Sequence, residues 1–448
     1  MALTIPQIVR QFKRDVATAL AAETITRICG YLGYVWRERV LDPVTTIQVF
    51  LLQVVHGNIA CSALSRLAEI AFSDEAYCQA RKRLPLALFR DLLERVCDAL
   101  FPQMQDSARW HGHRTWMIDG SSFSMPDTAE LQAHFGQPGA QAKGCGFPVA
   151  HLLVLFHAGT GLLLRAIASP LRTHDMRHAM IMHTEMDEGD VLLADRGFAS
   201  FAHLALLFTR KMHGVFRCHH RQIVDFRAGR AHTRQCKPRK GLPRSRYVRR
   251  LGHLDQVVEY TKPTAQPVWM DEARWRRLPQ SLLVRELRYR VRPRGHRPRD
   301  ITLVTTLLDP IRYPAAELAQ LYLSRWRIEV NFRHLKTTMG LETLRCKSVA
   351  GVLKELYMFA IVYNLVRLVM LQAAQRQQVP LERISFIDAL RWLRDTPLGG
   401  LLGELLVNPA RPARLEPRVL KRRIKEYNLM NKPRDELRKA LLRKKDAA

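Results

Sequence analysis

The residues of this sequence best suited to chemistry lie in one short segment, YLSRWRIEVNFRHLK at 322–336. In a helix, where each residue turns by about 100°, four polar side chains of this segment would share one narrow sector: Tyr322, Arg325, Glu329 and Lys336. The adjacent sector is apolar and would pack against a core: Leu321, Ile328, Phe332 and Leu335. An acid beside cations at the lip of a cleft fits two interpretations, a surface salt-bridge network or a site for a charged substrate.

Two aspartates upstream each follow an apolar run that is typical of a strand. RTWMIDGSSF places Asp119 after one run and before the turn-prone Gly120, and DVLLADRGF places Asp195 after another. We predict that each aspartate ends its strand. An aspartate in this position is often only a turn residue, but two of them in this order ahead of Glu329 favour one shared site.

Three carboxylates brought together predict a metal-dependent reaction. Asp119, Asp195 and Glu329 would repel one another unless they held cations, and hard carboxylate oxygens favour Mg²⁺, with Mn²⁺ as a substitute. Two such ions about 4 Å apart can activate water or a 3′-hydroxyl and stabilise the oxygen that leaves a phosphodiester. Cleavage of a phosphodiester is therefore the chemistry that these residues favour.

These motifs resemble a known family. The spacing Tyr, two residues, Arg, three residues, Glu, six residues, Lys within 322–336 is similar to the signature of DDE transposases of insertion sequences (IS4-type). The surroundings of the aspartates, DGSSF and LLADRGF, also resemble that family, and Arg196 and Gly197 carry the second match. The resemblance implies a catalytic core with the fold of RNase H and retroviral integrase.

The resemblance also implies roles. Asp119 would bridge two Mg²⁺ ions, and Asp195 and Glu329 would each complete one. Further side chains would contact DNA: Tyr322, Arg325, Lys336 and Arg196. The protein would bind the terminal inverted repeats of its element, cleave the ends and join the 3′-hydroxyls to target DNA, as a homodimer on paired ends. It would act in the bacterial cytoplasm, in association with the nucleoid.

The charge balance points to the same class of partner. Lys and Arg number 71 against 41 acids, a formal charge of +30, which favours nucleic acid as the partner, with an anionic membrane surface as the alternative. The resemblance implies that this nucleic acid is double-stranded DNA. The most membrane-like run, Leu356–Ala374, carries Asn364 and Arg367 in its middle, so we expect a buried helix and no membrane partner. The cysteines form no Cys-x-x-Cys pair, which argues against a zinc ribbon.

We predict an α/β fold, an RNase H-like mixed sheet flanked by helices. A hairpin is expected over 147–168, followed by helices near 177–186 and 199–211 and a strand from Gly214. The long Arg-, Pro- and Gly-rich segment before Glu329 contains strand-like runs and predicts an inserted β-rich unit. The expected units are a helical DNA-binding domain at 1–110, the core at 111–220 and 301–375, the insertion at 221–300, and a basic helical region at 376–448.

Residues 62–85 have the pattern of a helix-turn-helix, with Ser73 as the cap of the second helix. That helix would expose Tyr77, Gln79, Arg81, Lys82 and Arg83, of which the three basic residues would contact DNA. A helical hairpin that serves only for packing is the alternative. In the insertion, Trp269 and Trp275 suit either base stacking or a small core.

Three other functions compete with a transposase. An RNase H-like nuclease that cuts without joining would need the same three acids, although the long insertion and the signature of 322–336 favour the transposase. A basic DNA-binding protein without catalysis is disfavoured because all three acids are present. A zinc nucleobase deaminase is excluded, since His183-Thr184-Glu185 is not followed by Pro-Cys-x-x-Cys.

Overall fold

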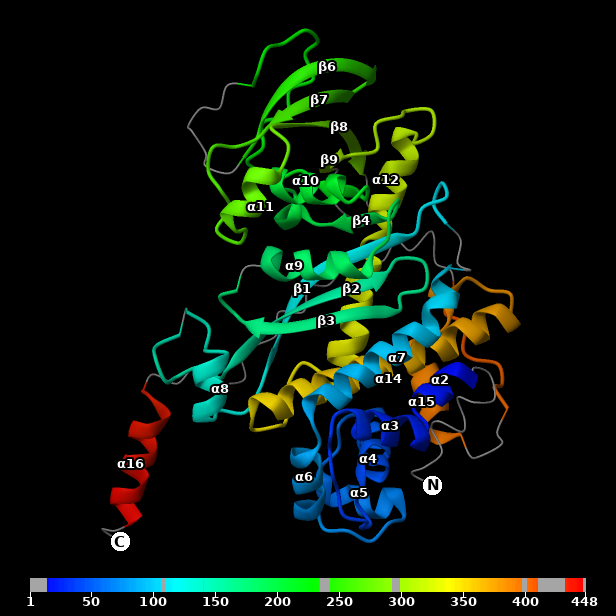
Figure 1. Cartoon of the computed structure of the whole chain (residues 1–448), viewed down its shortest axis with the longest axis vertical. Coiled ribbons are helices and arrows are strands. Elements are labelled where there is room, and N and C mark those ends of the chain that lie inside the picture. The colour runs from blue at the N-terminus through cyan, green and yellow to red at the C-terminus, as the bar shows by residue number, and fades with distance from the viewer. Residues whose placement is uncertain are drawn as a thin grey trace.

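A mixed sheet of nine strands runs through the computed structural model, in the order β3-β2-β1-β4-β5-β9-β8-β7-β6 (Figure 1). The strands are β1 Thr115–Ser124, β2 Val149–His157, β3 Leu163–Pro170, β4 Val191–Ala194, β5 His213–Arg217, β6 Arg244–Gly252, β7 Asp255–Thr261, β8 Ser281–Val291 and β9 Arg299–Thr305. The structure describes residues 14–105, 109–139, 141–173, 175–233, 242–291, 299–396, 401–409 and 432–445. The predicted α/β fold with a mixed sheet is confirmed.

Strand β1 lies at the centre of the half of the sheet that carries Asp119 and Asp195. It pairs antiparallel with β2 and parallel with β4, and β4 pairs parallel with β5. The predicted hairpin of β2 and β3 is present, and Gly161 in its turn has a φ of +68°, which glycine adopts without strain. All four residues of β4, Val191–Ala194, are buried, because helices cover both faces of the sheet here.

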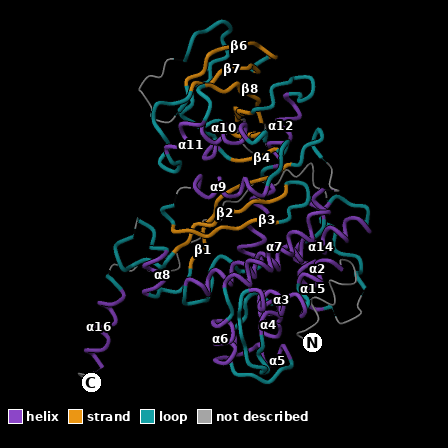
Figure 2. Tube along the Cα trace, in the orientation of Figure 1, coloured by secondary structure: helices purple, strands orange, loops and turns teal. Residues whose placement is uncertain are grey.

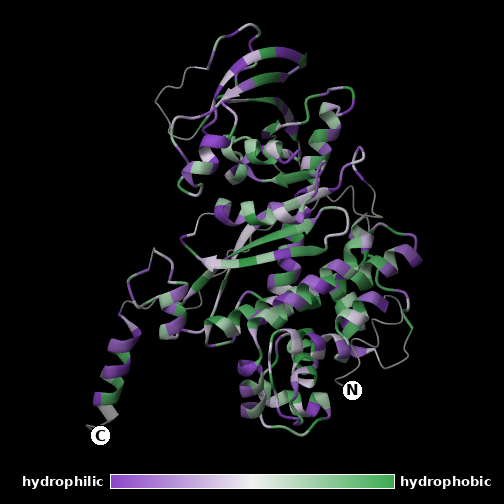
Figure 3. Ribbon diagram, in the orientation of Figure 1, coloured by the Kyte–Doolittle hydropathy of each residue, from purple (hydrophilic) through white to green (hydrophobic). Residues whose placement is uncertain are grey.

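Helices lie on both faces of strands β1–β3 (Figure 2). Helix α9 (Asp175–Met182) lies on one face, and α10 (Phe201–Thr209) packs farther along the sheet, on β5. The other face carries α7 (Leu86–Gln105), α13 (Arg327–Arg333) and α14 (Val349–Arg376). Phe156 of β2 meets the rings of Phe332 and Tyr363 edge-on at 5.7 and 5.8 Å, which fixes α13 and α14 against the sheet. Figure 3 shows hydrophobic residues concentrated along these central elements.

Helix α14 is the apolar helix that the sequence predicted to be buried. By length and composition it could cross a bilayer, yet 83% of its most apolar window is buried inside the protein. Its polar residues have partners: Asn364 exchanges two hydrogen bonds with the backbone of Leu163, and Arg367 Nε donates to the Thr160 carbonyl at 3.0 Å. The helix therefore packs as part of the core.

The N-terminal part consists of helices packed beside α14. They are α2 (Arg14–Ala19), α3 (Ala22–Tyr31), α4 (Pro43–Val55), α5 (Cys61–Ala68) and α6 (Asp74–Arg83). Ser73 caps α6 as predicted, since its hydroxyl accepts from the Ala76 amide at 3.1 Å. Asn58 Nδ2 donates to Glu355 Oε1 at 2.5 Å, so these helices are tied to the core. Residues 1–13 of the predicted helical domain lie outside the described residues.

The segment between β5 and α12 (Ala315–Ser324) is rich in strands and continues the main sheet. Strand β9 pairs with β5, and β8, β7 and β6 follow outward. Strand β6 was not predicted, because its sequence RSRYVRRLG is basic rather than apolar. Trp269 and Trp275 are each 8% exposed and pack into the core here, so neither ring is open to a base. The basic stretches at 234–241 and 292–298 lie outside the described residues.

The C-terminal region contains two further helices, α15 (Phe386–Asp395) and α16 (Arg434–Lys445). Helix α15 packs on α14, whereas α16 extends away from the other elements (Figure 1). Arg434 anchors the start of α16 through an ion pair with Asp127 at 3.0 Å. The basic tail that was predicted to be partly helical falls mostly at 410–431, outside the described residues, and α16 is its helical end.

Candidate active site

The two aspartates lie side by side at the centre of the sheet. The parallel pairing of β1 with β4 ends at Met117 opposite Leu193, and each aspartate comes two residues later on its own strand. Asp195 ends β4 as predicted. The prediction for Asp119 was wrong: β1 continues to Ser124, because antiparallel pairing with β2 gives the residues after Asp119 strand partners and overrides the turn tendency of Gly120.

Glu329 comes from the segment 322–336, which is not one regular helix. Helix α12 ends at Ser324, α13 begins at Arg327, and a π-helix covers His334–Thr338. The prediction of one continuous helix over this segment is therefore wrong, although Arg325 still lies near both Tyr322 and Glu329. Short π-helical turns are frequent at functional sites, where they redirect a side chain. Here the irregular turn carries Lys336, whose Nζ donates to Ser121 Oγ at 3.0 Å.

Arg325 links the acids. Its Nη1 donates to Asp119 Oδ2 at 3.3 Å, and its Nη2 lies 3.8 Å from Glu329 Oε1. The side chain is 9% exposed, yet its Nε has no hydrogen-bond partner among the residues that the structure describes. The guanidinium thus neutralises two carboxylates in part and keeps unused donors.

The pKa of Asp119 is raised by its burial and by the neighbouring acids. Burial raises the pKa of Asp119 above its ordinary value, and the negative charges of Asp195 and Glu329 raise it further. The Gly120 amide and the Arg325 guanidinium act in the opposite direction. Three carboxylates from distant positions therefore share one electrostatic environment, and such a cluster favours a bound cation.

The three acids offer the kind of ligand atom that a hard divalent cation prefers. Carboxylate oxygens are the ligands that Mg²⁺ and Mn²⁺ prefer, and Asp119, Asp195 and Glu329 supply six of them. As the side chains stand, no group of three or more His, Cys, Asp or Glu residues in the described ranges is close enough to hold a metal ion. Arg325 provides the positive charge between two of the carboxylates. A metal would bind here together with a rearrangement of these side chains.

Tyr322 differs from its predicted role as a DNA contact. Its side chain is 3% exposed, and its ring lies 5.8 Å from the Arg325 guanidinium. Burial raises the pKa of Tyr322 to about 12, so the hydroxyl stays protonated. That hydroxyl has no hydrogen-bond partner in the described part of the chain. The buried Tyr322 ring therefore packs near the Arg325 guanidinium and is not positioned to contact DNA.

The predicted DNA contacts of helix α6 divide into two groups. Lys82 and Arg83 are exposed, as is Arg196 beside the second aspartate. The predicted DNA contact by Arg81 is wrong. Arg81 donates to Gln53 Oε1 at 2.8 Å and to Cys346 Sγ at 2.7 Å, and its guanidinium lies 3.9 Å from the Phe50 ring. The predicted exposure of Tyr77 is wrong too, since that residue is fully buried. Both side chains hold α6 in place and are unavailable to DNA.

One pair near the acids was missed from the sequence. On the opposite face of β1, His151 Nε2 lies 3.0 Å from Asp175 Oδ1. A Cβ on Gly120 would be 2.8 Å from His151 Cε1, so the imidazole lies directly against the backbone that follows Asp119. The signal was Gly120 itself, because a glycine within a strand often marks a close approach.

Comparisons with known proteins are consistent with this geometry. A family model described as a transposase DDE domain matches residues 110–365. The transposase InsG for insertion sequence element IS4, from Escherichia coli strain K12, is 25% identical over 373 residues, or 79% of this chain and 77% of InsG. The putative transposase InsZ from the same strain is 26% identical over 167 residues, or 37% of this chain and 53% of InsZ.

One solved structure also aligns with the chain. The cryo-EM structure of a piggyBac transposase synaptic complex with hairpin DNA has a TM-score of 0.43 at 9% identity, over 87% of this chain and 76% of that chain.

Proposed function

Because this chain belongs to the DDE transposase family, we propose that it is the DNA transposase of an insertion sequence. It would bind the terminal inverted repeats of the element, cleave the ends by phosphodiester hydrolysis and join the 3′-hydroxyls to target DNA. The similarity to the transposase InsG over most of both chains supports an insertion sequence as the substrate.

One observation carries the proposal: the parallel register of β1 and β4 places Asp119 beside Asp195, and Arg325 connects Asp119 with Glu329. Acids without such a role are rarely gathered this way, because their mutual repulsion costs stability. Arg325, a cation between two carboxylates, suits the binding of a polyanionic substrate.

Transposases of this family typically use a divalent metal. Asp119, Asp195 and Glu329 would hold two Mg²⁺ ions, or Mn²⁺ as a substitute. When bound, the ions supply activation of the attacking oxygen and neutralisation of the leaving one. The chain's own cations hold the DNA: Arg325, between Asp119 and Glu329, offers positive charge to a phosphate, and Lys336, on the same face of β1 as Asp119, holds the next phosphate.

Further parts of the proposal concern the assembly. The partners are the two ends of the element and a target duplex, in keeping with the formal charge of +30. Both ends must be processed together, so the working form is a homodimer that pairs them. The site of action is the bacterial cytoplasm, at the nucleoid.

A nuclease that cuts without joining is the competing function, and a catalytically inactive DNA-binding protein is the next. All three share the DNA-binding step, so the test must separate binding, cleavage and joining.

The test uses the full chain and labelled duplexes from either side of the gene that encodes it, in Mg²⁺ or Mn²⁺. Wild type is expected to cleave at the boundary of the element, and Glu329→Gln to bind the same DNA without cleaving it. Glu404→Gln, at an exposed glutamate outside the site, is the matched control and should cleave normally.

Each other result selects a different function. Cleavage without strand-transfer products indicates the nuclease. Specific binding without cleavage in either metal indicates the inactive DNA-binding protein. Equal cleavage by wild type and Glu329→Gln would show that the acid assigned to the site is wrong.

A further inference from the structure

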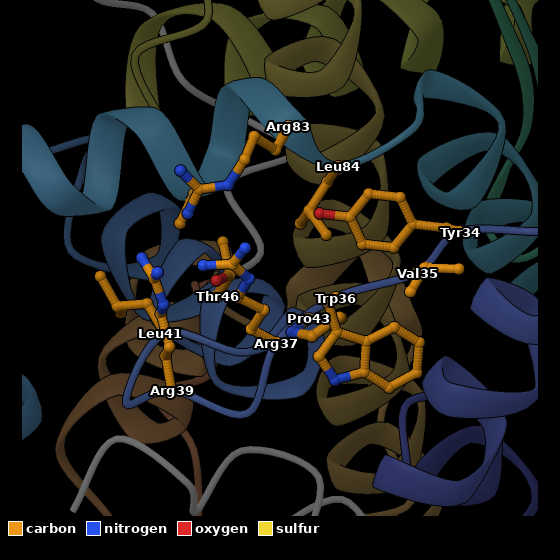
Figure 4. Close-up of a pocket in the computed structure, with 11 residues that line it drawn as sticks. Tyr34, Val35, Trp36, Arg37, Arg39, Leu41, Pro43, Thr46, Arg83 and Leu84 are labelled. Carbon is orange, nitrogen blue, oxygen red and sulfur yellow. The ribbon is translucent and has the colours of Figure 1, made fainter.

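A second basic site lies in the N-terminal helices, away from the three acids. A cleft of about 260 Å³ opens between the 34–41 loop, the start of α4 and the end of α6. Arginines line one side of it and aromatic rings the other: Arg37, Arg39, Arg83, Tyr34 and Trp36. In Figure 4 the three guanidinium groups gather at one end of the cleft, and the two rings lie toward the other.

The local sequence fixes the loop that carries most of these residues. Helix α3 ends with Gly33 at a φ of +64°, and the Tyr34 amide donates back to the Cys29 carbonyl at 2.9 Å, an arrangement that stops the helix. The loop ends where the Asp42 carboxylate accepts from the Thr45 amide at 2.6 Å and caps α4. The segment between is pinned at both ends, so its side chains are presented in a defined way.

The arginines of the cleft have no partners in the protein that would explain them. Arg37, Arg39 and Arg83 are exposed, and none forms an ion pair or side-chain hydrogen bond within the described ranges. Glu38 does not line the cleft, and the carboxylate of Asp42 is used as a helix cap. Three like charges facing one cleft repel one another unless an anion lies between them.

The aromatic side of the cleft adds a flat apolar surface. The rings of Tyr34 and Trp36 are nearly parallel, at 16° with centroids 6.1 Å apart, and both are half-buried. Parallel rings beside arginines match a nucleotide, which has a flat base and an anionic phosphate. The cleft is smaller than the roughly 300–1,000 Å³ that encloses a drug-sized ligand, so it suits one unit of a strand that continues on both sides.

We propose that this cleft binds the backbone of the element's DNA, with phosphates held by Arg37, Arg39 and Arg83 and one nucleotide packed against Trp36. This inference rests on the proposed function, since it names a contact that the same DNA makes. It goes further in assigning the binding to the 34–41 loop and the end of α6, and in excluding Arg81 from it.

The cleft is connected rigidly to the catalytic half of the molecule. Lys354 of α14 is 4% exposed, and its Nζ donates to the carbonyls of Arg81 and Lys82 at 3.0 Å each. The residue that follows them, Arg83, is the α6 member of the cleft. DNA held in the cleft is therefore held at a fixed position relative to α14 and the sheet that it covers.

The test measures equilibrium binding of labelled element-end DNA to the full chain over a series of salt concentrations. The cleft variant is Arg37→Gln, Arg39→Gln and Arg83→Gln combined. The control removes the same charge from three exposed arginines outside the cleft and the candidate active site, with Arg95→Gln, Arg210→Gln and Arg277→Gln. Thermal unfolding of each variant checks that the fold is kept.

The cleft variant is expected to lose affinity by roughly 10- to 100-fold and to show a salt slope shallower by about 3, because each phosphate contact adds about 0.9 to the slope. Trp36→Ala should lose roughly ten-fold in affinity with the slope unchanged, since stacking releases no counterions. Equal effects of the cleft and control variants overturn the inference while leaving the transposase proposal intact. Failure of the wild type to bind the DNA overturns both.

Discussion

Two buried arginines show opposite ways of holding a positive charge in this molecule. Arg285 of β8 is fully buried, and each of its guanidinium nitrogens donates a hydrogen bond. Nε and Nη2 donate to the Asp255 carboxylate, and Nη1 donates to the Tyr313 carbonyl at 2.6 Å. Arg325 is nearly as buried, yet its best contact is the 3.3 Å hydrogen bond to Asp119. The hydrogen-bond donors of Arg285 are therefore satisfied, whereas Arg325 keeps donors without a partner in the described part of the chain.

The difference separates a structural charge from a functional one. A buried ion pair with all hydrogen bonds satisfied holds a unique packing, and removing one partner leaves an uncompensated charge. A guanidinium with free donors, facing acids that repel one another, remains available to a ligand. Burial alone does not distinguish the two residues; the number of satisfied donors does.

The largest expected effect comes from the saturated arginine. Arg285→Met keeps the volume but leaves Asp255 buried and unpaired, so the free energy of unfolding should fall by about 3–5 kcal/mol. Arg325→Met should lower it by about 1 kcal/mol or less, because the acids that it faces are partly exposed to water. Urea unfolding of both variants measures the contrast, and equal losses would contradict it.

The second prediction concerns activity. Arg325→Met should lower the rate of DNA cleavage by roughly 10²–10³-fold, the usual loss when a charge that stabilises the transition state is removed. Arg325→Lys keeps the charge without the two-pronged donor geometry and should recover only part of the rate. Single-turnover cleavage at saturating DNA separates this loss from weaker binding. A full rate in Arg325→Met would mean that its free donors have no catalytic role.

The sequence was sufficient for the features that depend on local pattern. Apolar runs ending at Asp119 and Asp195 revealed the central strands, because a buried strand must be apolar whatever its partners are. The cap of α6 was also predictable, since Ser73 needs only the next turn of chain to act. The same pattern located the three acids on two strands and a later helix, and their catalytic role stays a prediction.

The features that were missed depend on distant partners. Strand β1 runs past Asp119 only because β2 lies beside it, and the Arg81 guanidinium is turned inward because it binds Gln53 and Cys346. Strand β6 is basic because it is an edge strand, and charges there hinder pairing with other chains. The cleft at Arg37 and Arg39 had no signal in the sequence, since part of its lining comes from the distant end of α6.

The third prediction tests how the neighbourhood of Asp119 is held. Gly120→Ala would push a methyl group against His151, which Asp175 holds in place, and should cost about 1–2 kcal/mol of stability together with a loss of cleavage rate. Removing the ring in Gly120→Ala/His151→Ala should restore much of the stability. Gly139→Ala, with open space around its Cβ, is the control and should change little. No rescue in the double variant would mean that the strain lies elsewhere.

The smallest expected effect is a gain of stability where an acid is neutralised. The raised pKa of Asp119 means that the folded state disfavours its charged form, so Asp119→Asn in chelating buffer at pH 7 should stabilise the fold by about 1 kcal/mol while abolishing cleavage. The advantage over wild type should shrink as the pH falls through the raised pKa of Asp119 and vanish below its unfolded value, where wild type is protonated too.

Asp309 has a lowered pKa, so its replacement should change Tm in the opposite direction to Asp119→Asn. The amides of Arg312 and Ile311 hold the pKa of Asp309 below its ordinary value, so its charged form stabilises the fold above the unfolded pKa and that contribution is lost as the pH falls. Asp309→Asn should therefore lower Tm at pH 7, with a difference that also closes in acid. If Asp119→Asn and Asp309→Asn shift Tm in the same direction, the folded state does not disfavour the charged form of Asp119, and the contrast between Arg325 and Arg285 loses its electrostatic basis.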